Sequence, residues 1–278
     1  MIQQKAYTDL NNFYSDNGDF LHRNFILTYT FQKMLDKVQQ GEISIYELYA
    51  FTNDSGGRII GMKVDEHYLL TGESWDEELM DKLVEKVELL KYKRWQFAGE
   101  RELILALFEK SGSEYLVIKD RVCYRCDSLN DIQLTSGQLE MAVMDDLETL
   151  ADISWSYSKA EYGKKHARAR EYMRELIYGG ILAGNFFVWR DQGRICAVAQ
   201  VIYNDGEPPI IGHLYTVNAV RNKGYATAIL ASITKNLLDI GHPGCCLLAD
   251  SSNPASLKVF EKVDYQVVGK TMLVSREL

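Results

Sequence analysis

A strand, a turn and an amphipathic helix follow one another without a break between Ile210 and Gly241. The turn reads Arg221-Asn222-Lys223-Gly224-Tyr225-Ala226. Behind it, apolar residues recur at the spacing of one helix face, at Ile229, Ile233, Leu237 and Ile240. The first N–H groups of a helix have no internal partner, and the helix dipole adds partial positive charge there. Gly224 lets an anion approach the backbone, and Arg221 and Lys223 add full charges. The segment therefore predicts an α/β fold with a pyrophosphate site at a helix start.

Two segments of the second half resemble signatures of the GNAT acetyltransferase superfamily. The turn is similar to the acyl-CoA-binding pattern [RQ]-x-x-G-x-[GA], through Arg221, Gly224 and Ala226. A second segment resembles N-P-x-S-x-x-x-[YF]-x-K-x-G-[FY], and it matches at Asn253, Pro254, Ser256, Phe260, Lys262 and Tyr265. Taken alone, the first match also fits a strand–loop–helix without a ligand. The spacing between the two leaves room for one helix and one strand, as in the family, so together they predict a GNAT fold.

The resemblance implies acetyl-CoA as the cosubstrate and direct transfer of its acyl group to an amine. Contacts to the cosubstrate are expected at Tyr215, Thr216, Val217, Arg221, Asn222, Lys223, Gly224, Tyr225, Ala226, Thr227, Asn253, Ser256 and Phe260. Backbone N–H groups around Tyr215–Val217 would align the pantetheine and polarise the thioester carbonyl. No metal is expected.

The general acid is the part of the family pattern that this sequence lacks. Phe260 stands where the family often has the tyrosine that protonates the leaving thiolate, and Asp264 stands where it often has glycine. The ring of Phe260 can still pack against the pantetheine. Replacement acids are sought among Tyr215, Tyr203, Tyr265 and Ser251.

The general base has two candidates. His213 has a suitable pKa and faces the same side of its strand as Tyr215. Its alternative role is that of a half-buried histidine at a sheet surface. Asp250 ends the next strand, near the expected acyl group, and its alternative role is that of a turn or cap acid for Ser251 and Ser252. The candidate catalytic set is therefore His213, Tyr215, Asp250 and Ser251.

The second half follows the GNAT order of elements, β-α-α-β-β-β-α-β-α-β. Its first strands and helices are expected at Leu139–Met144, Asp145–Trp155, His166–Tyr178, Asn185–Arg190, Arg194–Tyr203 and Ile210–Val217. The second of these helices is expected to be broken by Gly179, Gly180 and Gly184. After the helix behind Gly224 come a strand Cys245–Asp250, a helix from Pro254 and a strand Gln266–Ser275.

The first half repeats the later part of this order, which indicates an internal duplication. Its elements are expected at Ser44–Phe51, Arg58–His67, Asp76–Lys91, Gln96–Ala98, Arg101–Lys110, Tyr115–Asp120 and Val122–Asp127. The fold class is thus α/β (α+β), with two GNAT-like halves, each a mixed, mostly antiparallel sheet flanked by helices. A polar linker near Ser128–Gly137 divides a degenerate domain, residues 1–130, from a cosubstrate-binding domain, residues 131–278.

The two copies differ where phosphates would bind. The equivalent helix start of the first copy reads TGESWDEE, and Asp76, Glu77 and Glu78 suit a bare helix N-terminus but repel a pyrophosphate. The halves also differ in charge: residues 1–130 hold 16 basic and 22 acidic residues, and residues 131–278 hold 15 and 17. The first copy is therefore expected not to bind CoA.

Composition limits the remaining functions. A net charge of −8 argues against nucleic acid as a partner. No apolar run reaches the length of a membrane span and no signal-peptide pattern occurs, so a cytoplasmic protein is expected. Five cysteines form no disulfide framework, and Cys123-Tyr124-Arg125-Cys126 lacks the second pair or the histidines of a metal site.

These observations predict an N-acyltransferase, most simply an acetyltransferase, acting on a primary amine of a small molecule or peptide as a monomer or homodimer. One alternative is a catalytically weak or inactive CoA-binding regulator, which Phe260 and the uncertain base favour. Another is an aminoacyl-tRNA-dependent transferase, which also uses paired GNAT-like halves. It is disfavoured because the chain lacks a long helical hairpin and a basic surface.

Overall fold

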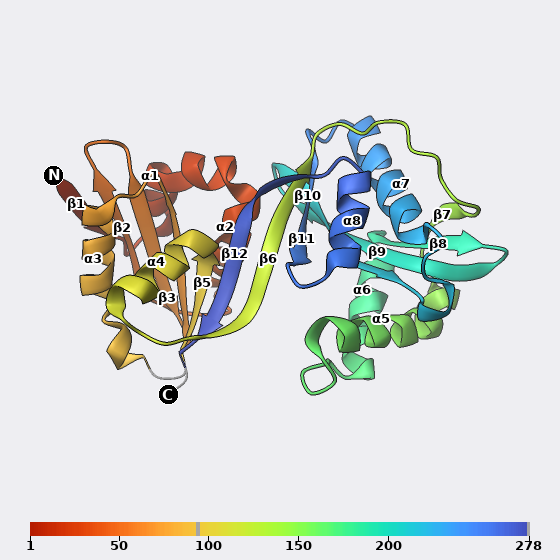
Figure 1. Cartoon of the computed structure of the whole chain (residues 1–278), viewed down its shortest axis with the longest axis horizontal. Coiled ribbons are helices and arrows are strands. Elements are labelled where there is room, and N and C mark those ends of the chain that lie inside the picture. Colours follow the sequence, from red (N-terminus) through yellow and green to blue (C-terminus); the bar gives the residue numbers. More distant parts are fainter. Residues whose placement is uncertain (93–94, 277–278) are drawn as a thin grey trace. The chain divides into compact units, whose positions relative to one another are not determined.

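The structure, a computed structural model, describes residues 1–92 and 95–276, and one order of elements occurs twice along it (Figure 1). The first copy consists of β1 (Ile2–Ala6), α1 (Leu10–Arg23), α2 (Phe25–Gln39), β2 (Ile45–Asn53), β3 (Arg58–Val64), β4 (His67–Glu73), α3 (Glu77–Val87), β5 (Gln96–Glu100), α4 (Arg101–Ser111) and β6 (Leu116–Cys126). The second consists of β7 (Gln138–Met141), α5 (Leu147–Tyr162), α6 (Arg170–Leu182), β8 (Phe186–Asp191), β9 (Arg194–Asn204), β10 (Glu207–Thr216), α7 (Tyr225–Asp239), β11 (Cys245–Asp250), α8 (Pro254–Lys262) and β12 (Gln266–Ser275). The duplication is therefore complete, and it includes the β1, α1 and α2 elements that the sequence did not reveal.

The chain forms two compact units that exchange segments near the C-terminus. The first unit contains Met1–Cys123, Ala249–Asn253 and the segment from Val267, and the second contains Tyr124–Leu248 and Pro254–Gln266. The division into domains at residue 130 stays a prediction.

The first unit is built on a mixed sheet. Antiparallel pairs join β1 to β2, β2 to β3 and β3 to β4, whereas β4 and β5 are parallel. The last strand of the chain, β12, pairs with β5 in antiparallel fashion, from Thr271↔Glu100 to Ser275↔Gln96. A strand from the C-terminal segment therefore joins the sheet of the first unit, between β5 and β6.

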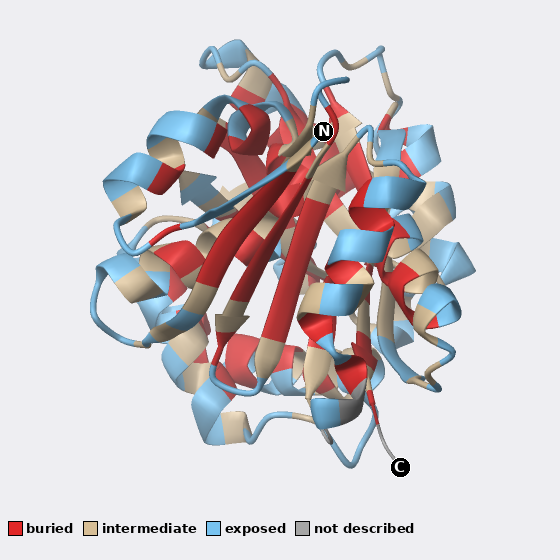
Figure 2. Ribbon diagram, turned by 90° about the vertical axis from the view of Figure 1, so that its left-hand side faces the viewer, coloured by how far each residue is buried: buried red, intermediate tan, exposed pale blue. Residues whose placement is uncertain are grey.

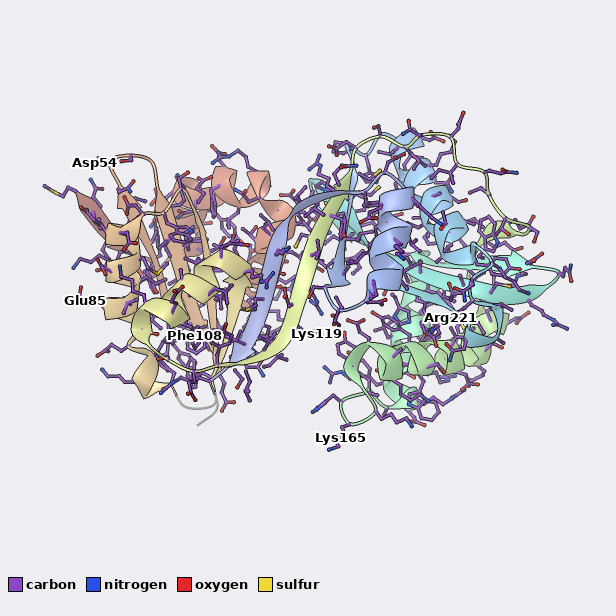
Figure 3. The ribbon with its side chains drawn as sticks, in the orientation of Figure 1. Asp54, Glu85, Phe108, Lys119, Lys165 and Arg221 are labelled. Carbon is purple, nitrogen blue, oxygen red and sulfur yellow. The ribbon has the colours of Figure 1, made fainter. Side chains whose placement is uncertain are left out.

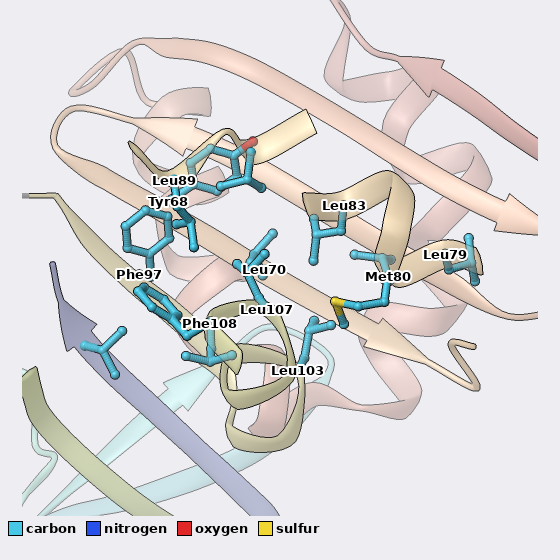
Figure 4. Close-up of a cluster of buried hydrophobic side chains, with 14 of the residues drawn as sticks. Tyr68, Leu70, Leu79, Met80, Leu83, Leu89, Phe97, Leu103, Leu107 and Phe108 are labelled. Carbon is cyan, nitrogen blue, oxygen red and sulfur yellow. The ribbon is translucent and has the colours of Figure 1, made fainter. Parts of the chain in front are cut away.

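Helices cover both faces of this sheet, which explains why its strands are almost continuously apolar. On β2, Leu48 and Ala50 belong to a cluster with α1 and α2, whereas Tyr49 and Phe51 belong to a cluster with α3 and α4. Side chains alternate between the faces of a strand, so each β2 residue supplies one of two cores. Figure 2 shows the buried strands, and Figure 4 shows the α3–α4 core around Tyr68, Phe97 and Phe108.

The second unit has the same kind of sheet, with β7 to β10 antiparallel and β10 parallel to β11. The helices α5 and α6 pack on one face through a core that includes Leu150, Ile177 and Phe186. The helix α7 covers the other face with its buried residues Ile229, Ile233 and Leu237. Both halves are thus mixed, mostly antiparallel sheets flanked by helices, as the sequence predicted.

Several predicted elements have different bounds in the structure. The strand expected at Arg58–His67 ends at Val64, because Asp65 takes a left-handed backbone conformation with φ 45° and turns the chain, and a further strand that was not expected, β4, begins at His67. The two strands expected at Tyr115–Asp120 and Val122–Asp127 are one strand, β6. The helix expected at Asp76–Lys91 ends at Val87, since Glu88 is left-handed with φ 45°.

The helix expected at His166–Tyr178 was also wrong in its bounds, because α6 continues through Gly179 and Gly180. Gly180 has a packing role. A Cβ atom added there would lie 3.2 Å from the side-chain oxygen of Asn185 and 3.3 Å from the side chain of Phe186. The glycine therefore lets the helix approach β8 and does not break it.

Candidate functional site

The helix α7 begins with free backbone donors. Gly224 is its N-cap in a left-handed conformation, with φ 84°, which glycine adopts without strain. In the described part of the chain no side chain caps this helix start, and its first turn holds no acidic residue. The first N–H groups of α7 are thus available to an anion.

Two cations flank this helix start. Arg221, Asn222, Lys223 and Gly224 are exposed. The Nε of Arg221 donates to the backbone oxygen of Thr216 at 3.3 Å, and its guanidinium lies 5.2 Å from the centre of the Tyr215 ring. The residues that the sequence predicted for a phosphate site therefore gather around one exposed helix N-terminus (Figure 3).

A group that the sequence did not reveal anchors the start of α7 from inside. The Tyr225 hydroxyl donates to Oδ2 of Asp191 at 2.6 Å, and Ser136 Oγ donates to the same oxygen at 2.9 Å. These hydrogen bonds hold the pKa of Asp191 below its ordinary value, and the bond to Asp191 raises the pKa of Tyr225 to about 12. The Tyr225 ring is buried, so this residue positions the turn from below and only its backbone can face an anion.

The strands beside the turn separate. The register of β10 and β11 joins them at Ile210↔Cys246, and no further pair is recorded toward the end of β10 in the described residues. On its other edge β10 stays paired with β9 up to Thr216↔Ala197, after a register shift between Gly212 and Tyr215. One edge of β10 is therefore open next to the turn Arg221–Ala226.

Backbone donors on this open edge are fewer than the sequence predicted. The Val217 N–H donates to the backbone oxygen of Cys196 at 2.9 Å, on the β9 side. Because neighbouring residues of a strand point their N–H groups to opposite edges, the Thr216 N–H faces the open edge. Thr216 is thus a residue whose N–H points toward this open edge.

His213 is held by the core of the second unit. Its Nε2 lies 2.9 Å from Oγ of the fully buried Ser154, and its ring centre is 4.2 Å from that of Tyr157 and 5.4 Å from that of Phe186. Burial lowers the pKa of His213 to about 3, so the imidazole is neutral at pH 7 and a weak proton acceptor. This environment favours packing over general base catalysis.

Tyr215 is mostly buried, and its hydroxyl donates to Oδ1 of Asn218 at 3.0 Å. Tyr215 lies on β10 directly before Thr216, the residue at the open edge. Among the alternative acids, Tyr265 is buried, with its hydroxyl 2.8 Å from Thr234 Oγ1, whereas Tyr203 is exposed on β9.

Asp250 and Ser251 belong to the first unit, so their placement relative to His213 and Tyr215 is not described. Lys119 Nζ lies 3.0 Å from Oδ2 of Asp250, and Ser252 donates to its Oδ1. Burial opposes ionisation, but hydrogen bonds from Ser252 and Lys119 hold the pKa of Asp250 below its ordinary value. Asp250 is therefore an ionised, paired carboxylate. The backbone N–H of Ser251 donates to the backbone oxygen of Asp120.

The second predicted segment forms α8. Asn253 precedes Pro254, the first residue of the helix, and Ser256 lies in the first turn. Phe260 is buried, and its ring centre is 5.4 Å from that of Tyr124. This ring packs in the core of the second unit, at the position where the family pattern has tyrosine.

The equivalent helix start of the first copy is occupied by its own carboxylate. Asp76 is the N-cap of α3, and its Oδ1 accepts from the Leu79 N–H at 2.9 Å. The strands β4 and β5 stay paired over four positions up to Leu70↔Gly99. The first copy thus lacks both the bare helix start and the open strand edge of the second.

Three comparisons place these features among known proteins. Residues 189–274 match the model of the FR47-like protein family. A solved structure described as an acetyltransferase from the GNAT family from Colwellia psychrerythraea covers 99% of this chain and 100% of its own, with 13% identity and a TM-score of 0.62. A GCN5-related N-acetyltransferase from Sphaerobacter thermophilus gives the same TM-score, with 10% identity over 99% of this chain and 95% of its own.

A third structure decides the architecture. It is described as a tandem GNAT protein from the clavulanic acid biosynthesis pathway, and it covers 99% of this chain and 98% of its own with 10% identity and a TM-score of 0.51. The chain has the tandem GNAT fold. No significant match to a curated protein was found.

The described residues were also compared with the requirements of a metal site, a membrane span and a disulfide. They contain no group of three or more His, Cys, Asp or Glu side chains placed to hold a metal. No described helix is both long and apolar enough to span a membrane. All five cysteines are buried and unbonded to one another.

Proposed function

We propose that this tandem GNAT protein is an acyl-CoA-dependent N-acyltransferase that moves an acetyl group from acetyl-CoA to a primary amine of a small molecule or peptide. The observation that carries the proposal is the bare N-terminus of α7 at Gly224, next to the open edge of β10. A pyrophosphate would accept from the first N–H groups of α7 and pair with Arg221 and Lys223. The thioester would then lie along β10 with its carbonyl toward the Thr216 N–H.

In this arrangement catalysis rests chiefly on positioning. A neutral amine attacks the thioester carbonyl, the Thr216 N–H stabilises the charge that develops on oxygen, and the thiolate leaves. The neutral His213 and the paired Asp250 are poorly suited to accept the amine proton, so proton transfer to water is expected. Among the candidate acids, Tyr215 is the one closest in sequence to Thr216, whose N–H is the proposed donor to the oxyanion.

Two titrations test the proposal. Calorimetry with acetyl-CoA should show one site per chain, because the acidic start of α3 excludes the first copy. Loss of thioester absorbance with a panel of primary amines should then reveal transfer. Two equivalent sites, or no binding at all, would contradict the proposal.

A second function is favoured by Phe260, which offers no hydroxyl at the position of the usual acid. In this case the protein binds acetyl-CoA as a regulator and does not turn it over. The amine panel separates the two functions, since tight acetyl-CoA binding without thioester loss for any amine supports the regulator.

A further inference from the structure

A pocket with a volume of about 110 Å³ lies in the first unit, and it does not involve the α7 turn. Its walls come from α2, β4, β5, β6 and β12, and the whole lining belongs to one compact unit. An engineered cavity of about 150 Å³ accommodates benzene. The pocket is therefore of a size for a ligand of roughly four to six non-hydrogen atoms.

The charged side chains of the pocket are both cations, Lys119 and Arg121 of β6, and no acid is among the described residues that line it. Lys119 is neutralised by Asp250 at 3.0 Å. The side chain of Arg121 makes no hydrogen bond or ion pair with any residue in the described ranges 1–92 and 95–276. The pocket thus presents one guanidinium whose charge is unmatched (Figure 3 labels Lys119 on the same strand).

The rest of the wall is apolar except for four threonines. Leu27 and Phe31 of α2, Leu69 of β4 and Met272 of β12 contribute hydrocarbon. Such a surface favours an apolar ligand body of matching length.

One of the threonines in the pocket wall already has a hydrogen-bond partner. Thr71 lines the pocket, is buried, and donates its hydroxyl to Oε1 of Glu100 at 2.7 Å. The proton of the Thr71 hydroxyl is therefore already donated to the Glu100 carboxyl. Glu100 itself is not part of the lining, so it offers no direct partner to a cationic ligand.

We propose that this pocket binds a small organic monocarboxylate, with its carboxylate paired to Arg121 and its hydrocarbon against α2, β4 and β12. A guanidinium binds a carboxylate through two parallel N–H···O bonds, which gives direction as well as charge. Because no acid lines the pocket, a simple amine is excluded as its ligand, and the volume of the pocket excludes a carboxylate with a long hydrocarbon chain. The site is separate from the acetyl-CoA site proposed above and does not depend on it.

Calorimetry with the full chain at constant ionic strength tests this site. The probes are straight-chain carboxylates from acetate to hexanoate, with the amide and the primary amine of the same carbon skeleton. We expect a Kd between about 10 µM and 10 mM for the best carboxylate, given the affinity that so few atoms can supply. The amide and the amine should bind at least about tenfold more weakly, since they lose the charged pair.

Variants locate the site. Arg121→Gln should lower the affinity for the best carboxylate at least about tenfold. The control is Arg125→Gln, which should leave this affinity unchanged. Arg125 lies on the same strand but pairs with Asp127 in the second unit. Circular dichroism confirms that both variants fold.

Three results would each overturn the assignment. They are no carboxylate binding at about 10 mM, equal affinity for carboxylate and amide, and full affinity in a folded Arg121→Gln variant. An acetyl-CoA titration of the same samples reports on the proposed function independently, so the two failures are distinguishable.

Discussion

Glu100 should make the stability of the protein fall as pH rises through neutrality. Its carboxyl lies at the end of β5, where Oε1 accepts from Thr71 and Oε2 is buried without a hydrogen-bond partner in the described residues. Burial raises the pKa of Glu100 from 4.5 to about 7, against the opposing effect of the Thr71 hydrogen bond. The folded chain therefore holds a proton that the unfolded chain releases near pH 4.5.

The magnitude follows from linkage. One pKa unit corresponds to about 1.4 kcal/mol, so a rise from 4.5 to about 7 corresponds to about 3 kcal/mol. Below pH 4.5 both states are protonated and the contribution is fully present. Between pH 4.5 and 7 the unfolded chain binds fewer protons than the folded chain, so the free energy of unfolding decreases, and above pH 7 the loss is complete.

The variant Glu100→Gln isolates this effect, because glutamine keeps the oxygen that accepts from Thr71 and cannot ionise. Urea unfolding of both proteins from pH 4.5 to 8.5 should give a difference in the free energy of unfolding that shifts by about 3 kcal/mol in favour of the variant. Glu102→Gln, an exposed neighbour on α4, serves as the control. Parallel curves for wild type and Glu100→Gln would refute the reasoning.

The other predictions concern the candidate site. Gly224→Glu should lower acetyl-CoA affinity about 100-fold or more in calorimetry by placing a carboxylate in the phosphate space. Gly206→Glu is the control, since it has a similar left-handed conformation in open surroundings, with φ 74°, and only its backbone strain is shared. Asp76→Ala should cost about 1 kcal/mol in thermal or urea unfolding by removing the α3 cap, and an unchanged free energy of unfolding would count against that capping role. Phe260→Tyr should leave acetyl-CoA affinity nearly unchanged and raise the transfer rate if its hydroxyl reaches the sulfur, whereas no transfer by parent or variant supports the regulator. His213 should stay neutral in an NMR titration down to about pH 5, because burial lowers its pKa to about 3, and a midpoint near 6.5 would contradict its buried environment.

The strength of local signals explains which elements could be predicted. The bounds of β11 and β12 and the start of α8 at Pro254 are as predicted, because turn residues and a proline mark them in the sequence. The strand β4 was missed since β3 and β4 are apolar on both faces and only the Asp65-Glu66 turn separates them. The helix α1 was not predicted, although its side chains Phe13 and Phe20 are fully or nearly fully buried.

The candidate site divides in the same way. The sequence determined that α7 begins at a glycine preceded by two cations and that α3 begins with acids, because capping and the helix dipole act within one turn of the chain. It could not determine the environment of His213, which depends on Ser154, a residue 59 positions away. Nor could it show that Asp191 holds Tyr225.

By itself, then, the sequence determined the order of strands and helices in the second half, a partial repeat of that order in the first half, and the difference between the two helix starts. Only the tertiary structure decided that β12 joins the sheet of the first unit between β5 and β6, and that Asp250 pairs with Lys119 across 131 positions of the chain. The physical reason is range. Helix caps, turns and apolar periodicity depend on residues a few positions apart, whereas strand pairing and buried ion pairs join residues whose proximity exists only once the whole chain has folded.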